Sequence, residues 1–95
     1  MAGKQYILIE VCNREISEPK LFSNYEDAFE EMIKKFSGCI GVPKEDVGIE
    51  VETSGLYERE GRCSISRNCA WANGISRSNF DWEIFCTDFF HEKGE

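Results

Sequence analysis

The sequence is poor in long apolar runs, and this shortage argues against a membrane protein. No apolar run in the 95 residues approaches the roughly 18 to 20 that cross a bilayer. The first apolar segment is short and is soon interrupted by Glu10, which does not fit a signal peptide. We therefore expect a cytoplasmic protein that does not enter a membrane.

Basic residues are also few. The chain has 11 Lys and Arg against 18 Asp and Glu, a formal net charge of −7. The longest basic run is Lys34-Lys35, so the positive stripe that neutralises phosphates in nucleic-acid binders is missing. We expect no binding to DNA or RNA.

Histidine occurs only once, at His91, and the five cysteines contain no C-x-x-C pair. Zinc sites normally use close cysteine or histidine pairs, and a catalytic thiolate needs a positioned base or an electropositive pocket. No phosphate-binding, dinucleotide-binding or hydrolase motif is present. The sequence therefore predicts no catalytic residue, no metal site and no cofactor. The odd cysteine count favours free, buried thiols in a reducing compartment.

What the chain does contain is enough apolar material for one core. Hydrophobic residues make up 41% and aromatic residues 13% of the sequence. A chain of this length fits one domain, which we expect over residues 1–90, with a mobile tail over 91–95.

The first half of the chain predicts a strand followed by a helix. Residues 5–12 are dense in β-branched and aromatic side chains, as in a strand. Apolar residues over 24–36 line one helical face, and Ser23 with Glu26 fits a capping box at its start. Gly38 is a natural stop for this helix.

The middle of the chain predicts a loop and a further strand. Residues 13–20 are polar and contain a proline, as in a loop. Val47, Ile49 and Val51 alternate with polar residues, as in a half-buried strand.

The last third predicts a hairpin. One strand covers residues 62–72 with a bulge near 66–68, and the other covers 80–86. Trp71 and Trp82 are interpreted as core residues facing the helix. The whole pattern predicts an α+β two-layer sandwich in the order β-α-β-β-β. One main helix would pack on a mostly antiparallel sheet of four or five strands.

Polar residues gather around this hairpin and form a candidate binding site. Loops held by a rigid sheet often carry binding residues, although asparagines there also serve as turn formers. The candidate binding residues are Arg67, Asn68, Asn73, Arg77 and Asn79.

Acidic residues between Lys44 and Glu60 form a second candidate surface. Such a patch fits a basic surface on another protein, and it can equally serve solubility. Phe85, with Phe89 or Phe90 beside it on the outer side of the sheet, would add an apolar interface. The candidate acidic patch consists of Glu50, Glu52, Glu58 and Glu60.

Three segments, Phe22 to Ala28, Ala70 to Gly74 and Asn79 to Phe85, resemble short bacterial proteins of gut Firmicutes and their mobile elements. The resemblance covers about a third of the chain. It implies a bacterial cytoplasmic setting and supplies no activity, because that group has none assigned.

These observations leave two hypotheses for the function. The first is a non-enzymatic protein–protein interaction module, binding another protein or a second copy of itself through its sheet face or hairpin loop. The alternative is a small-ligand-binding protein or enzyme that uses the polar residues around the C-terminal hairpin.

Overall fold

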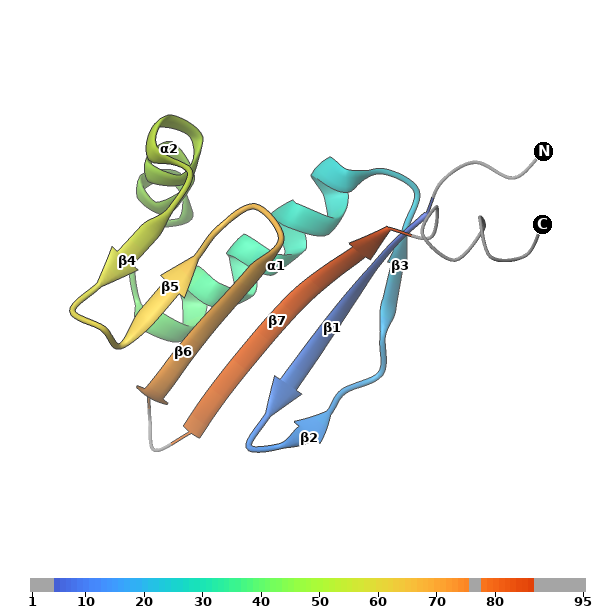
Figure 1. Ribbon diagram of the computed structural model, residues 1–95, viewed down its shortest axis with the longest axis horizontal. Coiled ribbons are helices and arrows are strands. Elements are labelled where there is room, and N and C mark those ends of the chain that lie inside the picture. The colour runs from blue at the N-terminus through green and yellow to red at the C-terminus, as the bar shows by residue number, and fades with distance from the viewer. Residues whose placement is uncertain (1–4, 76–77, 87–95) are drawn as a thin grey trace.

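The computed structural model describes residues 5–75 and 78–86 and has an α+β fold (Figure 1). Within these residues, α1 (Tyr25–Ile40) packs across one face of a seven-stranded antiparallel sheet, and α2 (Lys44–Ser54) packs beside α1 next to β4. The α+β sandwich class is confirmed. The strands are β1 (Tyr6–Cys12), β2 (Glu15–Ile16), β3 (Lys20–Phe22), β4 (Tyr57–Arg59), β5 (Cys63–Ile65), β6 (Cys69–Ile75) and β7 (Ser78–Cys86).

The sheet is larger than the sequence predicts, and its strands follow a different order. Three strands precede the helices and four follow them. The strand order is β2-β1-β7-β6-β5-β4, and β3 also pairs with β1. The first long strand therefore lies inside the sheet, between the edge strands β2 and β3 and the last strand, with which it pairs from Tyr6 opposite Cys86 to Cys12 opposite Phe80.

The segment predicted as a loop over 13–20 is an interrupted edge strand. Asn13 and Arg14 take positive φ angles of 52° and 73° and turn the chain back along β1. Both β2 and β3 then pair antiparallel with β1. Pro19 lies between them and has no N–H to donate, which explains why the edge is broken there.

Helix α1 begins and ends later than its sequence pattern predicts. Its N-cap is Asn24, whose side chain accepts a 2.8 Å hydrogen bond from the Asp27 N–H, and not Ser23. The helix continues through Gly38, which needs no special backbone angle there. It ends at Gly41, which takes the left-handed conformation with φ 77°.

The two glycines at this end of α1 give a matched prediction. A Cβ at Gly38 would meet nothing within 4 Å, so Gly38→Ala should raise the free energy of unfolding by about 1 kcal/mol. Gly41→Ala should lower it by about 1 kcal/mol, since alanine is strained at positive φ. Urea denaturation followed by circular dichroism measures both. Equal changes of one sign would contradict the helix end described here.

The strand predicted over Val47 to Val51 is wrong, because this segment belongs to helix α2. Val47 and Val51 are 0% and 3% exposed, whereas Ile49 between them is 59% exposed. A spacing of four residues places the two valines on one helical face. Pro43 stands at the N-cap of the helix, and Gly55, with φ 80°, ends it.

The core joins α1 to the sheet through aromatic side chains. Phe36 is fully buried and meets the rings of Tyr57 and Trp82 edge-to-face, with centroids 6.1 Å apart in both pairs. Trp82 is thus a core residue, as predicted. Its Nε1–H donates to Glu10 over 3.1 Å, and Lys35 of α1 pairs with the same carboxylate at 3.4 Å.

The bulge predicted near residues 66–68 is a turn that separates β5 from β6. Because the turn restarts the alternation, Ile65 and Ala70 are buried while Cys69 is exposed. Trp71 lies on the opposite side of the sheet from Ala70 and is half-buried there. The prediction that Trp71 faces the helix is therefore wrong.

A salt bridge between Lys20 of β3 and Glu31 of α1, 3.0 Å long, makes stability depend on pH. The hydrogen bond from Lys20 lowers the pKa of Glu31 below its ordinary value. A carboxylate with a lowered folded-state pKa stabilises the fold above the unfolded pKa, and that contribution is lost as the pH falls through the folded pKa. In Lys20→Met, NMR titration should find the Glu31 pKa raised toward its ordinary value. An unchanged Glu31 pKa would contradict this contact.

Candidate functional site

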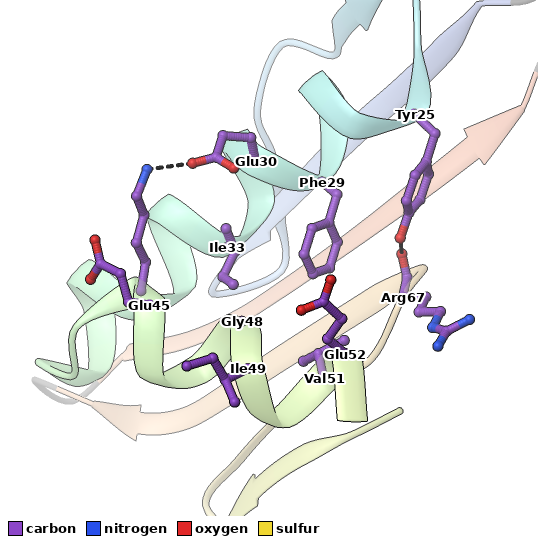
Figure 2. A pocket seen from close by; sticks show the side chains of 11 residues that line it. Tyr25, Phe29, Glu30, Ile33, Glu45, Gly48, Ile49, Val51, Glu52 and Arg67 are labelled. Carbon is purple, nitrogen blue, oxygen red and sulfur yellow. Dashed lines mark hydrogen bonds and ion pairs between the residues drawn. The ribbon is translucent and has the colours of Figure 1, made fainter. Parts of the chain in front are cut away.

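A groove of about 620 Å³ lies between α1 and α2 (Figure 2). Phe29 and Ile33 of α1 form one wall, and Gly48 and Val51 of α2 form the other. Because the groove needs both helices, a sequence interpretation without α2 could not predict it. Charged side chains stand at its rim, namely Glu30, Lys44, Glu45, Glu52 and Arg67.

The turn that carries Arg67 borders one end of the groove. The Tyr25 hydroxyl donates a hydrogen bond to the backbone oxygen of Arg67, which ties this turn to α1. Burial raises the pKa of the Tyr25 phenol, and the nearby positive charge of Arg67 opposes this. The hydroxyl therefore keeps its proton at neutral pH. Figure 2 shows the Arg67 side chain directed away from the groove walls.

The predicted hairpin residues do not form one cluster. Arg67 and Asn68 lie in the turn before β6, whereas Asn73 and Asn79 pair opposite each other near the far end of β6. At about 3.4 Å per residue, the two places are roughly 17 Å apart along the strand. Arg77 lies outside the described residues. Among the described members of this set, Arg67 alone lines the groove.

Asn79 has a structural role in the described part of the chain. Its side-chain oxygen accepts from the Gly74 N–H at 3.0 Å, within the hairpin turn. Its backbone N–H donates to the Asn13 side chain at 2.9 Å, which joins the β1–β2 turn to β7. In both contacts an asparagine side chain accepts a hydrogen bond from a backbone N–H near a turn, which is a common structural role of asparagine.

The four glutamates of the predicted acidic patch lie on different surfaces. Glu50 and Glu52 both belong to α2. Because positions i and i+2 of a helix are about 200° apart around its axis, these two side chains point in nearly opposite directions, and Glu52 lines the groove. Glu58 is in β4 and Glu60 is in the turn that follows. The expected single patch therefore depends on a strand that the structure replaces with a helix.

The side of the sheet opposite α1, here called the outer face, is left uncovered by the described residues (Figure 1). Leu8 and Ile84 are buried beneath α1, so the alternate residues of these strands point outward. Leu21, Ile7 and Phe85 are then neighbours across β3, β1 and β7. Leu21 is 62% and Phe85 38% exposed. The outward position predicted for Phe85 is confirmed, while Phe89 and Phe90 lie outside the described residues.

Two carboxylates stand in the middle of this outer face, both on β7. Asp81 lies between Val11 of β1 and Trp71 of β6, and Glu83 lies between Ile9 and Cys69. Neither carboxylate makes an ion pair or hydrogen bond within residues 5–75 and 78–86. No Lys or Arg occupies an outward position on the described strands. The outward strand residues are Ile7, Ile9, Val11, Ile16, Leu21, Glu58, Ser64, Cys69, Trp71, Asn73, Asn79, Asp81, Glu83 and Phe85.

The described residues offer little catalytic chemistry. They contain no group of side chains that could hold a metal ion. Burial raises the pKa of the Cys39 and Cys63 thiols, which makes both weak nucleophiles at neutral pH. Cys69 is exposed, so the expectation of buried thiols is wrong for this residue. No helix among these residues has the length and apolar content needed to span a bilayer.

Searches of protein-family models, of curated proteins and of solved structures gave no match to this chain. The resemblance to short bacterial proteins therefore stays a prediction. A function for this fold has to be argued from the chemistry of its surfaces.

Proposed function

We propose that the protein is a non-enzymatic protein–protein interaction module that binds its partner through the outer face of its sheet. The observation that supports this most strongly is the apolar row of Leu21, Ile7 and Phe85, in which Leu21 and Phe85 are exposed and Ile7 is half-buried. Contiguous apolar patches on soluble proteins commonly mark interaction sites. Trp71 on the same face adds a residue type that is enriched among interface hot spots.

The chemistry of two of the five thiols also supports a binding role over a catalytic one. The raised pKa values of Cys39 and Cys63 disfavour nucleophilic catalysis by these two residues. A bacterial cytoplasmic location agrees with five cysteines that are all free. In such a setting the uncovered sheet face would be occupied by another protein or by a second copy of the chain.

Site-specific photo-crosslinking in cells of the source organism tests this proposal. A photoreactive phenylalanine analogue replaces Phe85 or Ile9 on the outer face, and Lys34 or Glu50 on exposed helix positions as matched controls. We expect one protein to be captured from both outer-face positions and from neither control. Capture from no position, or equally from all four, would contradict the proposal. Sedimentation of the purified chain shows whether the captured protein is a second copy.

The groove between α1 and α2 favours the alternative function, a small-ligand-binding protein. Its volume of about 620 Å³ falls within the range of small-molecule sites. A Cβ at Gly48 would lie 3.6 Å from Ile33, so a leucine there would fill the groove. Under this alternative, a metabolite that raises the melting temperature of the native protein should have no effect on Gly48→Leu. A shift of equal size in both proteins would place the ligand elsewhere.

A further inference from the structure

We propose that the partner of the outer face is an amphipathic protein segment that carries Lys or Arg beside its apolar residues. This inference rests on the proposed interaction function and specifies the chemistry of the partner. It follows from the way apolar and acidic side chains are interleaved on β7 and its neighbours. The apolar part of the face alone would accept many partners, whereas its charge selects among them.

The carboxylates lie where a partner covering the face would have to contact them. β7 pairs with β1 on one side and with β6 on the other, so Asp81 and Glu83 stand inside the sheet and not at its edge. They are two residues apart on one face, about 7 Å along the strand. Directly opposite neighbours in a sheet are about 5 Å apart, which puts Val11 and Trp71 against Asp81. A partner surface that extends from the row of Leu21, Ile7 and Phe85 to Trp71 therefore also covers Glu83 and Asp81.

Both carboxylates need a cationic partner once they are covered. Burying a charged group without a counter-charge is costly, and the cost falls when the charge is paired and hydrogen-bonded. Within the described residues neither carboxylate has such a partner, and no Lys or Arg points outward from the strands. The cation must therefore come from the molecule that binds.

The same charges argue against a second copy of the chain as the occupant. Two outer faces packed together would bring Asp81 and Glu83 of one copy against an equally acidic face of the other. Like charges across an interface are unfavourable and suppress wrong partners. The formal net charge of −7 on each copy adds to this repulsion.

Binding to synthetic helical peptides tests the chemistry directly. The probe peptide has leucine on one face and lysine on the other, and the comparison peptide replaces every lysine with glutamate. Isothermal titration at low salt should show binding of the lysine peptide only. In Asp81→Lys/Glu83→Lys the affinity for the lysine peptide should fall about tenfold or more, because two favourable ion pairs become repulsive.

A second double variant controls for the change in net charge. Glu50→Lys/Glu60→Lys alters the net charge by the same amount but lies on α2 and in the turn after β4. It should keep the affinity for the lysine peptide within about twofold, with circular dichroism confirming that both variants are folded. Equal losses in the two variants, or no binding of the lysine peptide to the native protein, would overturn the inference.

The two proposals can fail separately. If photo-crosslinking captures one protein from Phe85 and Ile9, but the captured segment is acidic or lacks Lys and Arg, the interaction function stands and the basic partner is refuted. If sedimentation shows a stable dimer that Phe85→Ser disrupts, the occupant is a second copy, which also refutes the basic partner. If nothing is captured from the outer face, the proposed function itself fails.

Discussion

Phe36→Ala should lower the free energy of unfolding by about 3 to 5 kcal/mol, the range found for large aromatic side chains removed from cores. Phe36 is fully buried and meets the rings of both Tyr57 and Trp82. These three residues come from α1, β4 and β7, so the ring joins the helix to the edge strand β4 and to the interior strand β7. Since small domains are stable by only about 5 to 15 kcal/mol, the loss is a large share of the total.

Chemical denaturation at neutral pH measures this effect, with Phe36→Leu as the control. Leucine keeps most of the apolar volume, so Phe36→Leu should cost less than half as much as Phe36→Ala. The slope of free energy against denaturant should stay constant if the native state remains intact. Losses below about 1 kcal/mol for Phe36→Ala would mean that α1 does not pack on the sheet through this ring.

The sequence predicts well those elements whose structure follows from one regular pattern of apolar residues. The apolar face of α1 repeats at helical spacing, and β7 alternates so regularly that Trp82, Ile84 and Phe85 all point as expected. The sequence leaves open whether the first strand lies inside the sheet or at its edge, and the structure places β1 inside, next to the edge strands β2 and β3. Strand order depends on long-range pairing, here of β1 with β7, which turn signals do not encode.

The turn between β5 and β6 changes which residues of β6 face the core. Cys63 and Ile65 are buried, and continued alternation would bury Cys69 and Trp71 as well. Because the turn over residues 66–68 replaces the expected bulge, Ala70 and Ala72 take the inward positions instead. This single change moved Trp71 to the outer face, where it contributes to the proposed interface.

The candidate sites were harder to predict because each depends on packing between distant segments. The groove requires α2 against α1, and only Arg67 and Glu52 of the predicted site residues line it. Asp81 and Glu83 were visible as polar residues of a strand. Their importance follows from the apolar neighbours that β1 and β6 bring beside them.

The segment from Val47 to Val51 fits both a strand and a helix on its apolar pattern alone. Residues 47, 49 and 51 alternate, but 47 and 51 are also one helical turn apart. The flanking residues favour the helix, since Pro43 precedes it, Glu45 and Asp46 lie in its first turn, and Gly55 follows. A five-residue window is too short to outweigh such end signals.

Aspartate substitutions distinguish a helix from a strand over Val47 to Val51, because the two structures predict very different losses in the free energy of unfolding. Val47 is fully buried in the core, so Val47→Asp places an unpaired carboxylate there and should cost more than about 3 kcal/mol. Ile49 is 59% exposed, so Ile49→Asp should cost less than about 1 kcal/mol, mostly through the lower helix propensity of aspartate.

Thermal and urea unfolding of the two variants, beside the native protein, measures the difference. A strand would bury both side chains on one face, so the two variants would then be destabilised alike. A helix requires Val47→Asp to unfold far more readily than Ile49→Asp. Because the groove exists only if α2 is a helix packed on α1, equal losses would remove both the helix and the small-ligand alternative that depends on it. The proposal for the outer face would be unaffected, since its residues belong to the strands of the sheet and not to α2.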